Sequence, residues 1–301
     1  MAERLAPEQV PLRIDSRPER PRGRSGRWLR RSIATLLSLA LIAAAAVVTL
    51  HFLALQRSAQ EVRATALVPP EMPVDVLVVL ARPGQELAMA GTLAALDDAG
   101  AQVHVLSLTS GEAQPPELDP AEGRVAGIRA DELAASGDLL GVEGITVAGY
   151  ADGTLLAADP AEVTGSISDV IDQVRPSAVL TVSDLTGQDT DSQAVAAYTL
   201  AAVQKEGSTV ARVWTVTRGD REVEWNALVA EPIAVDKPEA QVAVRIDDQS
   251  VIKGRVLLAH GTQSPDLVAA TYPYADRIPA WAYFRFWDRE YFALAWGQPI
   301  E

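Results

Sequence analysis

A run of 23 residues without a charged side chain, Ile33 to Leu55, constrains this chain more than any other feature of its sequence. As a helix rising about 1.5 Å per residue, the run is long enough to cross the roughly 30 Å hydrocarbon core of a bilayer. Nine arginines and four acidic residues precede it in residues 1–32. By the positive-inside rule, this arginine excess predicts a cytoplasmic N-terminus and an extracytoplasmic location for residues 56–301.

Two alternatives would export the same domain without anchoring it. A cleaved signal peptide has an apolar region of about 7–15 residues, which is shorter than this run, and the triplet Ala64-Thr65-Ala66 lies far beyond it. Arg30-Arg31 could be part of a weak twin-arginine signal. We therefore predict a transmembrane helix at 33–55, after a disordered basic segment at 1–32 and before a linker at 56–72.

The net charge of −14 is unevenly distributed. Residues 1–32 carry about +5, so the remainder carries about −19. An acidic body excludes nucleic acid as the expected partner, because phosphate binding requires clustered cations. The chain has no cysteine, which excludes disulfides and thiolate metal sites.

Residues 73–301 alternate between strand and helix patterns. Val74–Leu80 is a continuous apolar run, typical of a strand buried on both faces. The later patterns predict helices at 86–98, 121–140, 160–174 and 191–205, and strands at 103–108, 145–148, 178–182 and 210–217. This alternation predicts an α/β fold with a doubly wound, mostly parallel, Rossmann-like sheet. In such sheets, sites form at the carboxyl ends of the strands.

Beyond residue 218 the alternation stops. Residues 232–235 and 242–246 have the pattern of extra strands, and residues 250–260 that of a helix. Residues 281–296 include eight aromatic side chains. We expect this aromatic tail to pack on the domain, with a membrane-facing or glycan-stacking surface as the alternative.

Six short motifs follow these elements in a fixed order. They are Ala81-Arg82-Pro83-Gly84-Gln85-Glu86, Thr109-Ser110-Gly111-Glu112, Arg129-Ala130-Asp131-Glu132-Leu133, Tyr150-Ala151-Asp152-Gly153-Thr154-Leu155, Asp189-Thr190-Asp191-Ser192 and Ala259-His260-Gly261-Thr262-Gln263. The ordered set resembles the PIG-L/LmbE family, which includes N-acetylglucosaminyl deacetylases, over about residues 74–295. Its members carry AHPDDE, TRGE, R-x-x-E-L, Y-x-D-G-x-L, HPDH and aH-x-x-Q at these places. The resemblance implies a Rossmann-like fold and zinc-dependent amide hydrolysis.

The departures from the family pattern fall on the residues that the resemblance assigns to zinc and catalysis. The three zinc ligands correspond to Arg82, Gln85 and Ser192, and the general base corresponds to Gly84. Zinc binds imidazole, carboxylate or thiolate, whereas a guanidinium offers no lone pair. Without the metal, a water molecule keeps a pKa of about 15.7 instead of about 7. The resemblance therefore predicts a member that has lost zinc, carries no other cofactor and is catalytically inactive.

Other motif residues keep polar side chains that could still line a pocket. Glu86, Asp191 and His260 persist at family positions, and further ligand-binding candidates are Ser110, Glu112, Arg129, Glu132 and Asp189. Each has a simpler interpretation: His260 as a packing histidine, and Arg129 with Glu132 as a surface pair on one helix. Asp152-Gly153 is expected to form only a turn.

The place of Arg82 distinguishes two hypotheses. In the first, its guanidinium lies where zinc would bind and pairs with Glu86 and Asp191, which offsets the carboxylates left in the pocket. In the second, Arg82 points into solvent. A replacement Ca²⁺ or Mg²⁺ site could draw on Glu86, Asp184, Asp189 and Asp191, although a solvated acidic loop explains these residues as well.

Two functions therefore stay open. The first is a non-catalytic, membrane-anchored protein whose partner is a carbohydrate or an envelope protein. The second is an active N-acetyl-sugar deacetylase with an atypical metal site. Serine hydrolase chemistry is not expected, because the sequence has no G-x-S-x-G motif.

Overall fold

The computed structural model describes residues 24–55, 59–113, 124–184, 189–205, 207–229, 238–265, 271–275 and 277–300. The chain divides into two compact units, Met1–His51 and Phe52–Glu301. The first unit contains most of the helix α1 (Arg24–Leu55). Its segment Arg30–His51 is long and apolar enough to cross a membrane, a property that a signal sequence near an N-terminus shares.

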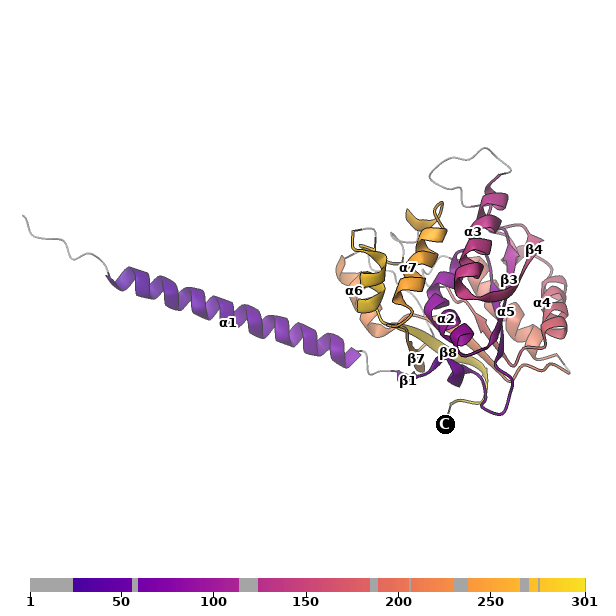
Figure 1. Ribbon diagram of the computed structural model, residues 1–301, viewed down its shortest axis with the longest axis horizontal. Helices are drawn as coiled ribbons and strands as arrows, with labels where there is room; N and C mark the ends of the chain where they lie inside the picture. The colour runs from indigo at the N-terminus through magenta and orange to yellow at the C-terminus, as the bar shows by residue number, and fades with distance from the viewer. Residues whose placement is uncertain are drawn as a thin grey trace, which may run out of the picture. The chain divides into compact units, whose positions relative to one another are not determined.

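The second unit is built on one sheet of eight strands among the described residues, in the order β1-β7-β8-β6-β5-β2-β3-β4 (Figure 1). The strands are β1 (Gln60–Val62), β2 (Asp75–Leu80), β3 (Gln102–Thr109), β4 (Val142–Tyr150), β5 (Ala178–Thr181), β6 (Arg212–Thr217), β7 (Val242–Arg245) and β8 (Arg289–Gly297). Only β8 runs antiparallel to its neighbours within this set. The mostly parallel sheet confirms the predicted fold class.

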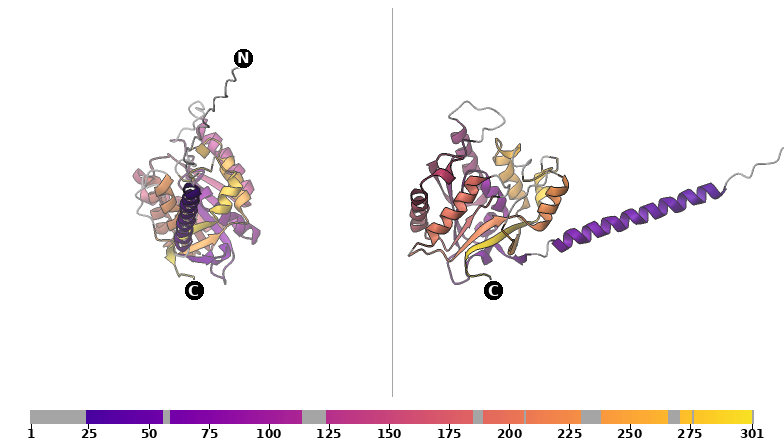
Figure 2. Two further views of the ribbon diagram at one scale, coloured as in Figure 1. Left: turned by 90° about the vertical axis from the view of Figure 1, so that its left-hand side faces the viewer. Right: turned by 180° about the vertical axis from the view of Figure 1, so that it is seen from behind.

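Helices cover both faces of this sheet (Figures 1 and 2). The helices α2 (Ala90–Asp98), α3 (Val125–Leu140) and α7 (Ser250–Ala259) pack against one another on one side, and α4 (Pro160–Val174) packs against α5 (Thr190–Val203) on the other. The remaining helices are α6 (Asp220–Val229), α9 (Ala280–Phe286) and the 3₁₀ turns η1 (Ala64–Leu67), η2 (Gln85–Met89) and η3 (Leu155–Ala157).

Local sequence signals explain where several elements begin and end. Asp159 caps α4 by accepting a hydrogen bond from the Ala161 amide at 2.9 Å, and Pro160 occupies the first turn, where its missing N–H costs little. Gly141 ends α3 at φ 67°, in the left-handed region that favours glycine. In β2, every residue from Val76 to Leu80 is fully buried, as its continuous apolar run predicts.

The structure corrects the linker predicted at 56–72. Residues 60–62 form β1, which pairs in parallel with β7, and Leu67 and Val68 are buried in the hydrophobic core. The prolines that follow suggested a stalk, but the apolar side chains before them gain more by burial than by exposure. The folded domain therefore includes residues from Ala59 onward.

The aromatic tail has a larger role than packing on the surface. Residues 289–297 form β8, which lies inside the sheet between β6 and β7. Phe292 is fully buried there, and its neighbours in register are Val216 and Val242. The strand predicted at 242–246 is confirmed as β7, whereas the strand predicted at 232–235 lies outside the described residues.

Candidate functional site

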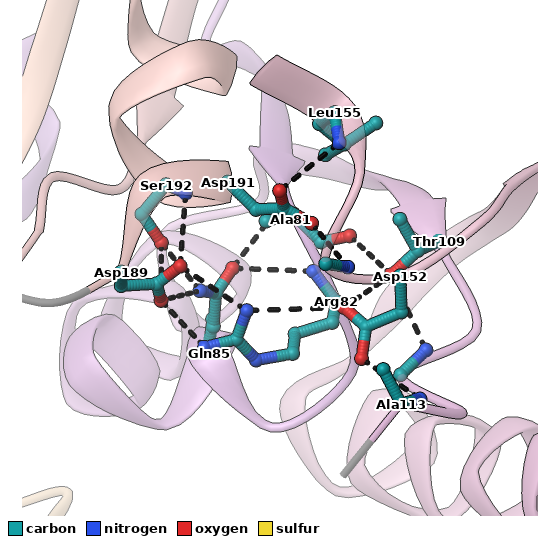
Figure 3. Close-up of polar contacts among 12 residues, drawn as sticks. Ala81, Arg82, Gln85, Thr109, Ala113, Asp152, Leu155, Asp189, Asp191 and Ser192 are labelled. Atoms are coloured by element: carbon teal, nitrogen blue, oxygen red, sulfur yellow. Dashed lines mark hydrogen bonds and ion pairs between the residues drawn. The ribbon is translucent and has the colours of Figure 1, made fainter. Parts of the chain in front are cut away.

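The motif residues meet at the carboxyl edge of the parallel strands (Figure 3). Arg82 and Gln85 follow β2, and Asp189 and Ser192 stand at the first turn of α5, which follows β5 along the chain. Because β2 and β5 are hydrogen-bonded neighbours, their carboxyl ends bring these two segments together. The sheet topology thus assembles residues that are more than 100 positions apart in sequence.

Four of these residues form what we call the arginine cluster: Arg82, Gln85, Asp189 and Ser192. The Arg82 guanidinium binds Asp189 with two contacts, Nη2 to Oδ2 at 2.5 Å and Nη1 to Oδ1 at 3.2 Å. The Gln85 amide donates to Ser192 Oγ at 2.7 Å and to Asp189 Oδ2 at 3.2 Å, and Ser192 Oγ donates to Asp189 Oδ2 at 2.7 Å. Asp189 is the acceptor at the centre of the cluster.

The partners of Arg82 differ from those predicted. Glu86 and Asp191 were expected to pair with the guanidinium, but its ion-pair partners are Asp189 and, at 3.9 Å, Asp152. Asp152 is buried and also accepts hydrogen bonds from the Thr109 hydroxyl and the Ala113 amide. The Arg82 side chain is 15% exposed and paired, so it does not point into solvent, but its partners are not the predicted Glu86 and Asp191.

Asp191 instead fixes the loop after β4. Its carboxylate accepts the Gly153 amide at 2.7 Å and the Leu155 amide at 3.0 Å. Burial raises the pKa of Asp191 above its usual value, and the neighbouring Asp152 acts in the same direction, while the two amide donors and Arg82 oppose the shift. Asp191 therefore joins α5 to the loop that carries Asp152.

A second group, which we call the histidine network, contains Glu86, Arg129, Glu132, His260 and Gln263. His260 Nε2 is hydrogen-bonded to Glu86 Oε1, and His260 Nδ1 lies 3.2 Å from the amide nitrogen of Gln263. Arg129 donates to Gln263 Oε1 at 2.9 Å, and Gln263 Nε2 donates to Glu132 Oε2 at 3.2 Å. The network joins α3 and the end of α7 to η2.

Burial decides between the interpretations of these residues. Arg129 is 1% exposed and Glu132 is 9% exposed, so the surface-pair alternative is wrong. His260 is fully buried and hydrogen-bonded on both ring nitrogens, which fits the packing-histidine interpretation. Glu132 also accepts the amide and the hydroxyl of Thr262, at 2.6 and 2.8 Å, and so closes the turn after α7.

Glu86 and His260 shift each other's pKa. Burial acts to raise the pKa of Glu86, but the charge and hydrogen bond of His260 outweigh burial and hold that pKa below its usual value. Burial likewise acts to lower the pKa of His260, but Glu86 outweighs it and raises the pKa of the imidazole above its usual value. Both shifts favour the charged forms of the two groups, whereas the Gln263 amide nitrogen beside Nδ1 can only donate and suits a neutral ring.

The donor set at the three metal-equivalent positions does not fit zinc. Gln85 Oε1, the lone-pair atom of its side chain, already accepts the amides of Ala81 and Arg82 at 2.8 and 3.2 Å. Ser192 is a neutral hydroxyl bound to Asp189, and Arg82 brings a fixed positive charge to the same place. A divalent cation there would meet a guanidinium instead of an imidazole lone pair.

The carboxylates proposed for Ca²⁺ or Mg²⁺ each have other partners. Glu86 binds His260, Asp189 binds Arg82, Asp191 binds two backbone amides, and Asp184 accepts the amide of Gln193 at 2.9 Å. Within the described ranges, no group of three or more His, Asp and Glu side chains is arranged to hold a metal ion.

Gly84 stands where the family's general base would be and is closely surrounded. Its φ of +95° lies in the left-handed region. A Cβ atom at this position would lie 2.7 Å from Oε1 of Gln263. The backbone here suits glycine, so an aspartate would meet both strain and a steric clash.

Two site residues were not proposed as site residues from the sequence: Asp152, expected to form only a turn, contacts Arg82, and Gln263 is central to the histidine network. Thr109, part of a turn that the resemblance places at the pocket, joins the ends of β2 and β3 through the Ala81 carbonyl. Glu112 accepts the Asp152 amide at 3.0 Å, and Ser110 is half-buried beside it. The signal for Gln263 was its position three residues after His260, on the same turn.

The fold and site define a Rossmann-like α/β domain with a group of polar side chains at the carboxyl edge of its sheet. Comparisons with known proteins give the family. The profile described as PIG-L: GlcNAc-PI de-N-acetylase matches residues 77–203. The chain is 30% identical to a 1D-myo-inositol 2-acetamido-2-deoxy-alpha-D-glucopyranoside deacetylase from Nakamurella multipartita, over 71% of this chain and 89% of that protein. The chain belongs to the PIG-L deacetylase family.

Two solved structures share the fold. N,N'-diacetylchitobiose deacetylase from Pyrococcus horikoshii superposes with a TM-score of 0.54 at 20% identity, covering 73% of this chain and 83% of that one. GalB, the 4-carboxy-2-hydroxymuconate hydratase from Pseudomonas putida KT2440, gives a TM-score of 0.57 at 18% identity, covering 76% and 99%. A deacetylase and a hydratase thus share this architecture, so the fold alone does not fix the reaction.

Proposed function

We propose that this chain is a membrane-anchored PIG-L family protein without deacetylase activity, which binds a glycan containing N-acetylglucosamine at the cell envelope. The observation that carries the proposal is the Arg82–Asp189 ion pair, which joins two of the metal-equivalent positions, Gln85 and Ser192, in one hydrogen-bonded cluster. The guanidinium of Arg82 thus supplies a positive charge at the site where the family pattern would bind zinc.

The loss of activity follows from the chemistry of these substitutions. Amide hydrolysis in this family's pattern needs a metal-activated water and a base beside it. Here a guanidinium and two neutral side chains occupy the ligand positions, and Gly84 occupies the position of the base. Without a metal the attacking water stays protonated at neutral pH, and no carboxylate replaces the base at residue 84.

The names of the relatives support the ligand class. The family profile names a de-N-acetylase of GlcNAc-PI, and the relative from Nakamurella multipartita is named for a 2-acetamido-2-deoxy-glucopyranoside. Both contain an N-acetylated glucosamine unit. A cleft that has lost the reaction can keep the sugar contacts, because binding and bond cleavage depend on different groups.

Two features support the membrane anchor. The segment Arg30–His51 can span a bilayer, and the arginine excess lies on its N-terminal side. The triplet Ala64-Thr65-Ala66 is a poor cleavage site, because Ala64 is buried and cutting after Ala66 would remove β1 from the sheet. A chain that keeps α1 therefore also keeps β1 and the complete sheet.

The test combines zinc content, turnover and binding, all on the full chain in detergent or nanodiscs. We expect no stoichiometric zinc after incubation with the metal, no deacetylation of an N-acetylglucosamine oligosaccharide, and binding of that oligosaccharide in preference to its de-N-acetylated counterpart. Stoichiometric zinc that is lost in Glu86→Ala or Asp191→Ala, together with turnover, would overturn the proposal in favour of an active deacetylase with an atypical metal site.

A further inference from the structure

The helices α7 and α9 expose apolar side chains on a surface that we call the α7–α9 face. The two helices pack together, and Gly254 of α7 lies directly against the backbone of Ala280 and Trp281. The surface residues of the pair are Val251, Arg255, Leu258, Ile278, Trp281, Arg285 and Phe286. Leu258 is 70% exposed and Phe286 is 61% exposed, so large apolar groups face solvent here.

The charge of this face is opposite to that of the rest of the domain. Residues 56–301 carry a net charge of about −19. In contrast, residues 249–265 and 277–287 contain no Asp or Glu, and both Arg255 and Arg285 are exposed. Cationic and apolar side chains therefore share one surface of an otherwise acidic domain, which is complementary to an anionic, partly apolar partner.

The first strand after α1 in the chain is fastened close to α9 in sequence. α1 ends at Leu55 and β1 begins at Gln60. β1 is joined to the segment after α9 by an ion pair between Glu61 and Arg289 at 2.6 Å. Phe286, the last residue of α9, precedes Arg289 by three residues, so β1 is joined by this ion pair to the segment that follows α9.

We propose that the α7–α9 face lies against the headgroup region of an anionic bilayer, with Trp281, Phe286 and Leu258 at the level where headgroups meet acyl chains. This inference rests on the membrane anchor of the proposed function. Tryptophan and arginine suit that level, because each places an apolar body beside a polar tip.

The absence of cysteine allows labels to be placed at single sites. We would attach an environment-sensitive fluorophore to Phe286→Cys and to Trp281→Cys in the full chain. The matched control is Leu156→Cys in η3, whose native side chain is 62% exposed, against 61% for Phe286. Ala44→Cys within α1 reports on the anchor itself. All variants are reconstituted in nanodiscs of phosphatidylcholine and phosphatidylglycerol that contain brominated lipid.

We expect brominated lipid to quench the Ala44, Phe286 and Trp281 labels several-fold more than the Leu156 label. The Phe286 and Trp281 quenching should fall in pure phosphatidylcholine and in Arg255→Glu/Arg285→Glu, but not in the control Arg175→Glu. The inference would be overturned if the Ala44 label is quenched but the Phe286 and Trp281 labels are quenched no more than the Leu156 label. That result would leave the membrane anchor in place. An unquenched Ala44 label would overturn the anchor and this inference together. Coupling between labels on two chains would show that a second copy covers the face, and would also overturn it.

Discussion

The arginine cluster and the histidine network meet at the neighbouring residues Gln85 and Glu86 but differ in origin and burial. The cluster consists of residues that depart from the family pattern, and its central ion pair is 15% and 13% exposed on the two sides. The network consists of residues that keep the family pattern, and its central pair, Glu86 and His260, is almost completely buried. The less completely buried group departs from the family pattern, whereas the fully buried pair keeps it.

A residue of the family pattern can therefore be kept without the reaction being kept. Glu86 binds the Gly84 amide at 2.8 Å as well as His260, and Glu132 closes the turn after α7. Removing either carboxylate would leave buried donors without a partner, which is costly whether or not the protein is an enzyme. Folding alone therefore explains why the buried family residues are kept. Only the residues of the arginine cluster bear on whether the protein is an active deacetylase.

The largest expected change comes from restoring the ligands of the family pattern. Arg82→His/Gln85→Asp/Ser192→His replaces the cluster with two imidazoles and a carboxylate, which zinc prefers. We expect about one tightly held zinc per chain by elemental analysis, against none in the parent protein. A control triple, Arg82→Gln/Gln85→Asn/Ser192→Gln, changes the same positions without supplying ligands and should hold none.

Restored zinc should not restore deacetylation. The base position is Gly84, whose backbone φ is +95° and whose added Cβ would meet Gln263. We expect the zinc-loaded triple variant to remain inactive on N-acetylglucosamine oligosaccharides, and the addition of Gly84→Asp to lower the melting temperature. Turnover by the triple variant alone would show that the base is dispensable and that the cluster was the sole defect.

The next largest effect concerns the buried network. Glu86→Ala removes the partner of His260 and the acceptor of the Gly84 amide. We expect a loss of about 3 kcal/mol in the free energy of unfolding, measured by denaturant titration, because breaking a buried pair leaves one charge uncompensated. Glu86→Gln keeps the shape and should lose less. Glu162→Ala, an exposed carboxylate on α4, is the control and should change stability by under about 0.5 kcal/mol.

A smaller loss is expected in the arginine cluster. Asp189 both pairs with Arg82 and caps α5, where it accepts the Ser192 amide at 3.1 Å. Asp189→Ala should cost about 2 kcal/mol, combining a lost cap with a partly exposed ion pair whose value is reduced by solvent screening. Asp189→Asn keeps a capping oxygen and should cost about half as much. Equal losses in the two variants would mean that the charge, and not the cap, carries the effect.

Much of the fold could be predicted from local patterns, and the reasons are visible in particular elements. β2 was recognisable as a continuous apolar run, and α4 from the helical pattern of residues 160–174, with Pro160 near its start. β1 and β8 were not, because a three-residue strand has too few positions to show a period and the aromatic residues of β8 hide its alternation. Both strands depend on partners distant in sequence, which local pattern does not encode.

The site shows the same division. The ordered motifs predicted which residues would gather at the carboxyl edge, and Arg82, Gln85, Asp189 and Ser192 do so. The pairing within the group was not predictable, since Arg82 could reach several carboxylates and only the placement of α5 selects Asp189. Asp152 was missed for the same reason: its side chain reaches Arg82 because Asp191 fixes the loop that carries it.

The smallest expected effect is the pH dependence of the buried pair. The folded-state pKa of His260 is raised above its reference value of 6.5, so its contribution to stability is complete below pH 6.5 and is lost as pH rises through the folded-state pKa. The pKa of Glu86 is lowered from 4.5, so its contribution is present above pH 4.5 and is lost as pH falls through the lower folded-state value. The pair therefore stabilises the domain most between these reference values.

The measurement compares the parent protein with His260→Gln across this range. The stability difference between them, from denaturant titrations, should be largest just below pH 6.5 and should shrink at alkaline pH as His260 loses its proton in the folded state. Each tenfold difference between the proton affinities of the folded and unfolded imidazole corresponds to about 1.4 kcal/mol of this decrease. The matched control is His104→Gln, which replaces a half-buried histidine on β3 outside the histidine network. A difference that stays constant from pH 6.5 upward would mean that His260 is buried as a neutral ring. The histidine network would then hold a hydrogen bond from a neutral imidazole to the Glu86 carboxylate, in contrast to the ion pair of the arginine cluster.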